Sequence, residues 1–490
     1  VGTVDQIFLS VLQTRHFFVR LFGLYGKVII FDEVHAYDAY QSEIFTRLLS
    51  WLRALNISVI LLSATLPSKV RSQLITAYAG SDYSQQENTD CYPRLTIVTP
   101  SSLETHKLPP PPSKPVNIEW IGETPGEVAT YLSKKLEDGG CAAVICNTVA
   151  RAQMIYQAVI EYNVAPGNTH LFHARFPYIW RKELEDMVLN RYGPAGVRAE
   201  RSVVIATQVI EQSLDLDFDF MISELAPIDL LIQRAGRLHR HSNHPRPSSL
   251  ATPCLALMQA ALTPDGDPDF GPSSYVYRRY HLLRTQAVLA NRSCLQLPEQ
   301  TPELIERVYG EHDLEVNDQI ASLLQKARNE MAKDIHESTR QARNRLIFPP
   351  DRDDFLRAHL ENLEEEATDI HTAFQALTRE APPGVSLVCL HRLQDGQVVL
   401  DPDKPDTVIN IGQKPSWDQV KDLLRQVAQV QRFDVVQYFN NQPKPECWAK
   451  VAALRYHHLV IFEHGRARLE GTPLILCLDR ELGLSFQKEV

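Results

Sequence analysis

The chain has 490 residues, 44% of them hydrophobic, and a formal net charge of −10 at pH 7. This length allows two to four domains with separate cores, and the charge argues against a surface coated with positive charge for duplex DNA or membranes. No apolar run reaches the roughly 18 residues of a membrane span, and no signal peptide is visible. We therefore expect a soluble, cytoplasmic protein, without a membrane partner, whose contact with nucleic acid would follow a local stripe.

The eight cysteines include no C-x-x-C pair, and several lie inside apolar, strand-like runs. This usage predicts reduced core thiols rather than zinc ligands or disulfides. The sequence begins with Val1 rather than Met, so we expect it to be cut from something longer.

The first hundred residues alternate strand and helix signals, as α/β domains do. Residues 27–33 form a run too apolar to be exposed on either face, which favours a central strand of a parallel sheet. A helix over 38–56, a second buried strand over 57–65 and a helix ending near Gly80 follow. We assign residues 1–107 to a partial first domain.

A proline-rich stretch over 108–116 predicts a stiff linker, because four consecutive prolines allow neither helix nor sheet. Beyond it, a second parallel-sheet domain is predicted for 117–262. Its expected strands and helices occupy residues 141–148, 150–162, 170–176, 180–191, 202–208 and 220–225.

Residues 263–384 are predicted to be mainly helical. A stripe of apolar residues from 356 to 377 favours packing against a neighbouring domain over a free coiled coil. Residues 385–490 show short strands and one helix capped by Ser416, which is typical of a small α+β domain.

Two acids stand where the first strand should end, at Asp32 and Glu33. Ligands of open parallel sheets collect at this carboxyl edge. Such a pair could serve phosphoryl transfer, with Asp32 on Mg²⁺ and Glu33 activating water, or it could simply cap the following helix.

Further polar residues follow other strands. Ser63 and Thr65 close the second strand, and the stretch 206–219 delivers Thr207, Gln208, Glu211 and Asp215 to one edge of the second domain. Arg234, Arg237 and Arg240 then follow at a spacing that predicts one helical face. By itself an arginine triplet usually forms a solvated or salt-bridged face. The order of these motifs along the chain, however, is far more specific than any one of them.

This order resembles that of DExH-type superfamily 2 helicases, in which D-E-x-H, S-A-T, A-T-Q-V-x-E-Q-S-L-D and Q-R-A-G-R-x-x-R are motifs II, III, V and VI. The details DEVHAYD, VGTVDQ, LLSATLP, LFHARF and IEQSLDLDFD resemble the helicase portion of the CRISPR-associated helicase-nuclease of type I systems. The resemblance implies two RecA-like domains, the first incomplete here, followed by a helical linker and a C-terminal accessory domain.

The resemblance also implies roles for single residues. Asp32 and Glu33 would bind Mg²⁺ and activate water, Arg237 and Arg240 would act as arginine fingers, and ATP would be the nucleotide. Residues for nucleotide binding or its coupling to DNA would be His35, Ser63, Thr65, Asp215, Gln233 and Arg234.

Single-stranded DNA is the implied track, followed in the 3′ to 5′ direction. Its predicted contacts are Thr3, Gln6, Thr148, Arg151, His173, Arg175, Thr207 and Gln208. The implied partners are a CRISPR RNA-guided surveillance complex and an HD nuclease, fused or separate.

Two expected parts are absent from the sequence. No phosphate-binding G-x-x-x-x-G-K-[ST] occurs, and the nearest stretch, residues 23–28, has the wrong spacing and precedes a strand. No HD nuclease site is visible around His312 and Asp313, and His457 and His458 fall on opposite faces of a strand.

Two classes of function therefore remain. The chain is part of an ATP-driven DNA translocase, in CRISPR defence or as another superfamily 2 helicase, or it is a shortened, ATPase-inactive module for DNA binding or complex docking. Without a phosphate loop, residues 1–490 alone are expected not to hydrolyse ATP.

Overall fold

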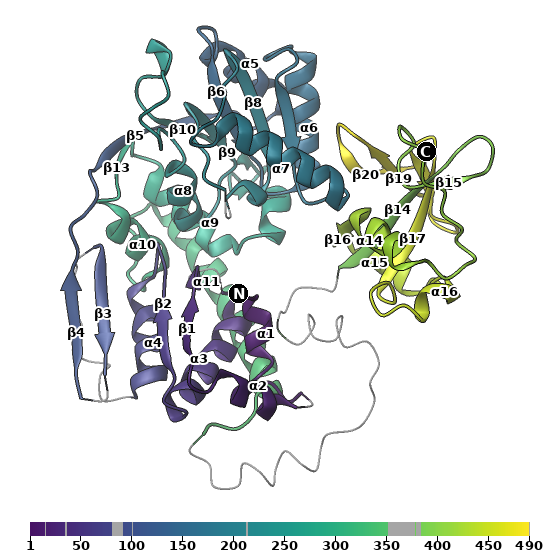
Figure 1. The fold of residues 1–490 in the computed structure, drawn as a ribbon. Helices are drawn as coiled ribbons and strands as arrows, with labels where there is room; N and C mark the ends of the chain where they lie inside the picture. The colour runs from purple at the N-terminus through teal and green to yellow at the C-terminus, as the bar shows by residue number, and fades with distance from the viewer. Residues whose placement is uncertain are drawn as a thin grey trace.

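The computed structural model describes residues 1–14, 16–34, 37–80, 92–99, 101–211, 214–350, 378 and 384–489. It contains two domains built on parallel strands, a long connecting helix and a C-terminal sheet domain (Figure 1). The expected α/β class and the two RecA-like domains are confirmed.

Domain 1 is organised around two parallel strands, with Val28 paired to Ser58 and Phe31 to Leu61. A separate antiparallel hairpin, β3 with β4, leads toward domain 2 (Figure 1). The elements are α1 (Val4–Phe8), α2 (Phe17–Leu24), β1 (Val28–Phe31), α3 (Ala39–Ala54), β2 (Ser58–Leu61), α4 (Ser68–Ala79), β3 (Arg94–Val98) and β4 (Leu103–Lys107).

The expectation that the first strand is buried on both faces is wrong for the described residues. Ile29 and Phe31 lie in the core with α3, whereas Val28 and Ile30 are 62% and 61% exposed. Ile60 on β2 and Leu62 directly after it are also exposed. The described helices of this domain therefore leave apolar side chains of both strands in contact with solvent.

Domain 2 contains a seven-stranded sheet in the order β13-β5-β10-β9-β6-β8-β7. The interior strand β6, between β9 and β8, is buried along its whole length. The elements are β5 (Lys114–Ile121), α5 (Pro125–Lys135), β6 (Gly140–Ile145), α6 (Val149–Glu161), β7 (Thr169–Phe172), α7 (Tyr178–Tyr192), β8 (Arg201–Ala206), β9 (Phe220–Ser223), α8 (Ile228–Ala235), β10 (Cys254–Met258), α9 (Arg279–Leu289), β13 (Cys294–Leu297) and α10 (Thr301–Tyr309).

The boundaries of domain 2 differ from those expected. β5 begins at Lys114, inside the predicted linker, because Pro115 sits at the start of the strand, where a missing N–H is tolerated. The edge strand β13 lies within the region expected to be helical and pairs antiparallel to β5. A short hairpin, β11 (Ala261–Leu262) with β12 (Pro268–Asp269), precedes it. The sheet is thus larger than predicted and not wholly parallel.

The helix α11 (Asp318–Arg345) connects the two domains a second time. Leu324 and Ala327 near its start belong to the core of domain 2, and Ala342 near its end belongs to the core of domain 1. Beyond the helix, the N–H of Ile347 donates to the carbonyl of Val11 at 2.9 Å. The stripe predicted over 356–377 lies outside the described residues.

The C-terminal domain confirms the expected strands and the helix capped by Ser416, which forms a capping box with Gln419. Its sheet order is β15-β14-β17-β18-β19-β20, with β16 also paired to β14. The elements are β14 (Val385–Arg392), β15 (Val398–Val399), α14 (Trp417–Arg425), β16 (Val427–Val430), α15 (Phe433–Asn440), α16 (Glu446–Ala449), β17 (His457–Glu463), β18 (Arg466–Arg468), β19 (Leu474–Asp479) and β20 (Gly483–Lys488). Within the described stretches of all domains, no helix is both long and apolar enough to span a bilayer.

The exposed apolar side chains predict that the sheet of domain 1 opens more easily than that of domain 2. Few buried contacts around a strand lower the free energy of local opening. We expect amide hydrogen exchange in β1 and β2 to be faster than in β6 and β8 by at least about tenfold. Equal protection of the two pairs of strands would contradict this expectation.

Candidate functional site

A cavity of 640 Å³ lies between domain 1 and domain 2. This volume is within the usual range of small-ligand pockets, about 300–1,000 Å³. Among its lining residues are Glu33 and Thr65 from domain 1, and Glu211, Asp215, Gln233, Arg237 and Arg240 from domain 2. The fold therefore gathers into one cleft six of the residues singled out for nucleotide chemistry or coupling.

The acids of domain 1 stand directly after β1. Glu33 is exposed and has φ of 56°, in the left-handed region that non-glycine residues rarely adopt. Its backbone N–H donates to Oδ1 of Asp32 at 3.0 Å. Asp32 is exposed beside the cavity but is not among its lining residues. Uncommon backbone geometry of this kind is found often at functional sites.

The stretch after β2 forms a second part of the domain 1 wall. Thr65 is only 3% exposed, and its hydroxyl has no hydrogen-bond partner among the described residues. The hydroxyl of Tyr92 donates to the carbonyl of Ala64 at 2.9 Å, while Ser63 is exposed. Because buried hydroxyls are nearly always paired, that of Thr65 is available for a group that enters the cleft.

Arg237 lies on the domain 2 wall and is 9% exposed. Its guanidinium donates to the carbonyls of Leu214 and Glu211, while its Nε has no partner in the described part of the chain. Burial, and then the neighbouring Arg240, lower the pKa of Arg237, whereas Glu33 opposes this shift from the facing domain. A permanently charged guanidinium thus faces the carboxylate of domain 1 across the cleft.

Arg240 is held at the edge of the cleft by an ion pair. Its Nε lies 2.5 Å from Oδ1 of Asp215, and the two side chains are 45% and 47% exposed. Nε2 of His241 lies 3.2 Å from the same oxygen. Exposed pairs contribute about 0–1 kcal/mol, so a stronger anion could draw Arg240 away at little cost.

The predicted helical face of three arginines is wrong. Helix α8 ends at Ala235, so Arg237 and Arg240 lie on the segment that follows it. Arg234 is fully buried and does not line the cavity; its Nε lies 2.6 Å from Glu211 and its NH1 2.7 Å from Ser223 Oγ. The structure thus places Arg234 in the core of domain 2, where it joins the helix to the sheet.

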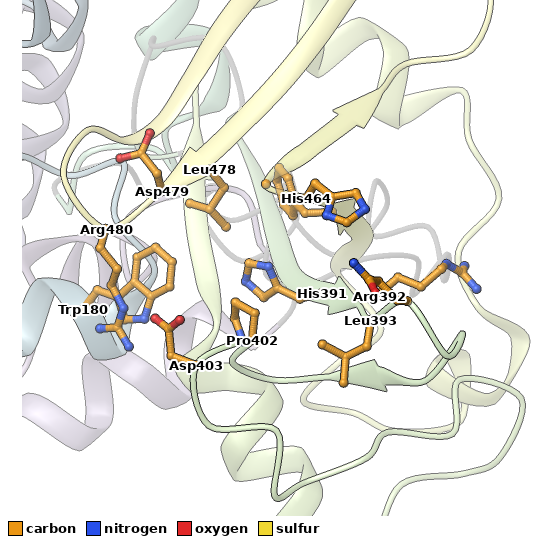
Figure 2. A pocket seen from close by; sticks show the side chains of 13 residues that line it. Trp180, His391, Arg392, Leu393, Pro402, Asp403, His464, Leu478, Asp479 and Arg480 are labelled. Carbon is orange, nitrogen blue, oxygen red and sulfur yellow. The ribbon is translucent and has the colours of Figure 1, made fainter.

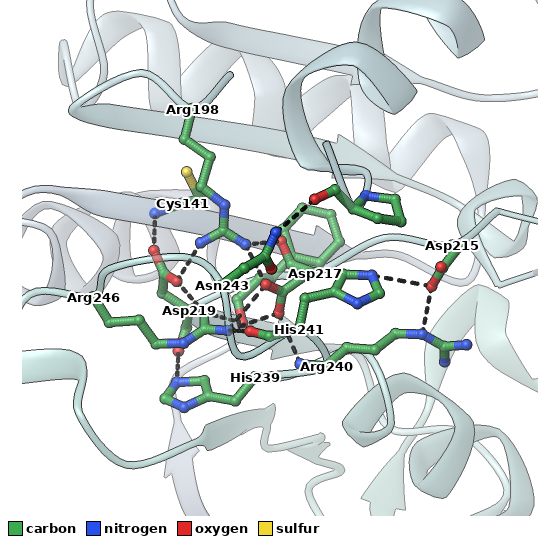
Figure 3. Close-up of polar contacts among 12 residues, drawn as sticks. Cys141, Arg198, Asp215, Asp217, Asp219, His239, Arg240, His241, Asn243 and Arg246 are labelled. Atoms are coloured by element: carbon green, nitrogen blue, oxygen red, sulfur yellow. Dashed lines mark hydrogen bonds and ion pairs between the residues drawn. The ribbon is translucent and has the colours of Figure 1, made fainter. Parts of the chain in front are cut away.

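A buried ionic cluster fixes this arginine segment, and the sequence interpretation missed it. Asp217 and Asp219 are almost completely buried and share Arg198 and Arg246 as ion-pair partners (Figure 3). The backbone N–H of Arg240 donates to Oδ1 of Asp217 at 2.8 Å. The signal was present in the alternating acids of the stretch LDLDFD over 214–219, but the burial that pairs them with distant arginines requires the fold.

The candidate DNA contacts fall into two groups. Thr148, Thr207 and Gln208 lie together at the carboxyl ends of β6 and β8, where the amide nitrogen of Gln208 donates to the carbonyl of Asn147 at 2.9 Å. Arg151 lies on the same edge but pairs with Glu224 at 3.3 Å. Thr3 and Gln6 are exposed at the start of domain 1.

The second group, His173 and Arg175, is covered by the C-terminal domain. His173 has no exposed surface, and its Nε2 lies 3.1 Å from the carbonyl of Leu482. Burial, and then Arg175, lower the pKa of His173 to about 3. The Arg175 guanidinium lies 5.1 Å from the ring centre of Phe486. In this arrangement neither side chain belongs to an open DNA path.

A second cavity, of 490 Å³, marks the same domain contact (Figure 2). There Arg480 lies over the ring of Trp180 on α7, 4.4 Å from its centre. Arg480 also pairs with Glu183 at 3.0 Å and with Asp401 at 2.6 Å. The C-terminal domain therefore contacts domain 2 here through stacking on Trp180 and one ion pair to Glu183, while Asp401 of its own domain orients Arg480.

The predicted roles of His35 and of a bound metal ion have no described site. His35 lies outside the described residues. Within the described stretches, no group of three or more His, Cys, Asp or Glu residues could hold a metal ion on its own.

Comparison with known proteins shows what the chain is similar to. Residues 138–243 match the family model of the CRISPR-associated nuclease/helicase Cas3, C-terminal. A CRISPR-associated endonuclease/helicase Cas3 of Thermus thermophilus is 34% identical over 99% of this chain and 57% of its own length. The chain resembles the helicase portion of Cas3. It spans little more than half the length of this relative.

Solved Cas3 structures agree over nearly the whole chain. A T. fusca Cas3-ATP structure has a TM-score of 0.85 and 30% identity, covering 99% of this chain and 56% of that one. A chain in a CRISPR RNA-guided surveillance complex, pre-nicking, has a TM-score of 0.77 and 29% identity, covering 99% and 60%. The resemblance inferred from the motifs, to a Cas3 helicase portion, is confirmed.

The ionic cluster behind the cleft of this Cas3-like chain gives a second prediction. Asp217→Ala leaves two largely covered arginines, Arg198 and Arg246, short of a partner, which should lower the free energy of unfolding of domain 2 by about 3–5 kcal/mol. The matched change Asp215→Ala removes a half-exposed pair and should cost less than about 1 kcal/mol. Hydrogen exchange of the β6, β8 and β9 amides measures both, and similar losses would contradict the assigned difference in burial.

Proposed function

We propose that this chain supplies most of an ATP-driven motor that translocates along single-stranded DNA, 3′ to 5′, in CRISPR antiviral defence. One observation supports it above the others: a cleft between two RecA-like domains with Glu33 and Thr65 on one wall and Arg237 and Arg240 on the other. A carboxylate facing guanidinium groups suits phosphoryl transfer, in which positioning and charge stabilisation provide most of the catalysis.

Each wall would have a distinct task. Glu33 would orient and deprotonate the attacking water. Arg237, whose buried Nε has no partner among the described residues, would stabilise the charge on the transferred group, and Arg240 would join it by leaving Asp215. Gln233 and Asp215 would contact the nucleotide. Ser63 and Thr65 would couple the state of the nucleotide to the binding of DNA.

A magnesium ion would be held through Asp32. Mg²⁺ bound to a nucleotide commonly takes one or two carboxylates and completes its shell with phosphates and waters. The single exposed carboxylate of Asp32, oriented by the N–H of Glu33 at 3.0 Å, fits this pattern better than a cation held by protein alone. The ion would neutralise phosphate charge, and the chain's own residues would supply the rest.

Single-stranded DNA would cross the carboxyl edges of both sheets, from Thr3 and Gln6 to Thr148, Thr207 and Gln208. Hydroxyl, amide and backbone contacts of this kind bind phosphates without reading sequence. Arg151, His173 and Arg175 would take part only if their present partners gave way. The proposed path therefore follows Thr3, Gln6, Thr148, Thr207 and Gln208.

The proposed partner is an RNA-guided surveillance complex that recruits the protein to DNA, as suggested by the similarity of this chain to a chain in a CRISPR RNA-guided surveillance complex. The name of the T. thermophilus relative includes an endonuclease, so an HD nuclease, fused or separate, would cut the strand that the motor moves.

A second candidate function is an ATPase-inactive module for DNA binding or complex docking. The observation that favours it is the absence of G-x-x-x-x-G-K-[ST] from residues 1–490. For the same reason we expect no ATP turnover from these residues alone, because nothing would fix the phosphates between Glu33 and Arg237. The two functions differ in a protein that carries this chain together with a phosphate loop: only the motor hydrolyses ATP.

The third prediction is made for such a protein. Arg237→Ala should lower DNA-stimulated ATP turnover by about a thousandfold or more, the scale of an arginine finger. Arg237→Lys should not restore it, because lysine lacks the planar fork. Steady-state turnover at saturating DNA is the measurement.

Asp186→Ala on the outer surface of α7 is the matched control, because its exposed pair with Lys182 lies outside the cleft, and it should leave turnover unchanged. A loss below about threefold for Arg237→Ala would remove this arginine from the mechanism, given the far larger losses typical of such residues.

A further inference from the structure

Tyr275 is an aromatic side chain that the predicted motifs and the cleft leave without a role. It ends the 3-10 helix Gly271–Tyr275, and it is 94% exposed. Large apolar rings are seldom left so fully in water, since burying one is favourable by about 1.5–3 kcal/mol. The ring is therefore available to a partner.

The segment that carries Tyr275 is anchored on both sides. Before it, the hydroxyl of Ser273 accepts a hydrogen bond from the side-chain amide of Asn147 at 2.9 Å. After it, the hydroxyl of Tyr277 accepts one from the side-chain amide of Gln208 at 3.1 Å. Ser273 is buried, and burial is the largest cause of the raised pKa of Tyr277. The exposed ring thus projects from a fixed turn rather than from a free loop.

Asn147 and Gln208, the two residues that anchor this segment, belong to the edge of domain 2 where the strands end in polar residues. Asn147 follows β6 and directly precedes Thr148, and Gln208 follows β8 and Thr207. The same two anchors contact each other, because the amide of Gln208 also donates to the carbonyl of Asn147 at 2.9 Å. Tyr275 is therefore placed beside the edge on which we propose that the DNA backbone lies.

The charges that follow Tyr275 fit a polyanion. Arg278 and Arg279 begin helix α9, whose first turn contains no acid. Arg278 is paired with Asp334 at 3.4 Å, but Arg279 is exposed and has no ion pair among the described residues. An aromatic ring followed by arginines combines the two elements that bind single strands without sequence preference, a stacking surface and a positive charge.

We propose that Tyr275 is a stacking platform for a base of single-stranded nucleic acid at the carboxyl edge of domain 2, with Arg279 near the adjacent phosphate. The inference rests on the proposed DNA track and adds to it a residue that reads the face of a base. Any base would be accepted, because each one offers a flat aromatic face.

The test measures binding by residues 1–490 of an end-labelled oligothymidine, followed by fluorescence anisotropy. Tyr275→Ala should weaken binding by about tenfold, within the range found for loss of a base-stacking aromatic, whereas Tyr275→Phe should bind like the original chain. Oligonucleotides with one 2-aminopurine should show quenched fluorescence at the stacked position, and Tyr275→Ala should relieve that quenching.

Tyr162→Ala is the matched control. This tyrosine is 50% exposed on the same domain, but it caps the opposite end of α6, about 20 Å from Thr148. Its removal should leave the affinity unchanged. An unchanged melting temperature for each variant establishes that the fold is intact.

The outcomes separate this inference from the proposed function. If the original chain has no affinity for single strands, the DNA track itself fails. If the original chain binds and Tyr275→Ala binds equally well, or if Tyr275→Phe loses as much as Tyr275→Ala, the stacking role alone is overturned. If Tyr275→Ala instead weakens a contact with another protein and leaves the affinity for DNA unchanged, the stacking role is also overturned.

Discussion

The buried pairing of Asp217 and Asp219 with Arg198 and Arg246 is the constraint on which the domain 2 wall of the cleft depends. These carboxylates lie in the strand-like stretch before β9, and they reach across to the segment after α8. Backbone bonds follow the same path, since Phe218 donates to the carbonyl of Arg237 at 2.9 Å and His239 donates to Phe218 at 3.0 Å. Without this attachment, the segment carrying Arg237 and Arg240 would be an ordinary surface loop.

The same constraint divides the three arginines into different physical classes. Arg234 lies in the core, Arg237 is held by two carbonyls and has a buried Nε without a partner among the described residues, and Arg240 is paired with Asp215 at the edge of the cleft. A buried charge is fixed by its partners, whereas a half-exposed pair exchanges easily. The arrangement thus combines one rigid and one movable cation in a single cleft.

Movement of the two walls is limited by how the domains are joined. The chain passes between domains once before β5 and again through α11, which contributes to both cores. A contact across the cleft adds to these connections: the N–H of Ser68, at the start of α4, donates to Glu306 of α10 at 2.6 Å. Because α4 begins just after Thr65, opening of the cleft would change the surroundings of that hydroxyl directly.

Much of this could be predicted from sequence because the relevant signals are local. Strand-ending acids, small hydroxyl residues and the spacing of arginines identified the cleft residues, and apolar runs located most strands. The predictions that failed depend on tertiary contacts. Exposure of Val28 and Ile30 depends on which helices cover the sheet, and the burial of Arg234 depends on Glu211. Likewise, His173 and Arg175 are covered by residues more than three hundred positions later in the chain.

The central claim is that Glu33 and Arg237 act on one phosphoryl group from opposite walls. A double-mutant cycle tests it most directly, with ATP turnover measured for Glu33→Gln, Arg237→Ala and the double variant in a protein that also carries a phosphate loop. Groups that act as a unit are strongly non-additive, so the double variant should lose little more than the worse single variant. Losses that multiply would show that the two residues act independently and would contradict the shared site.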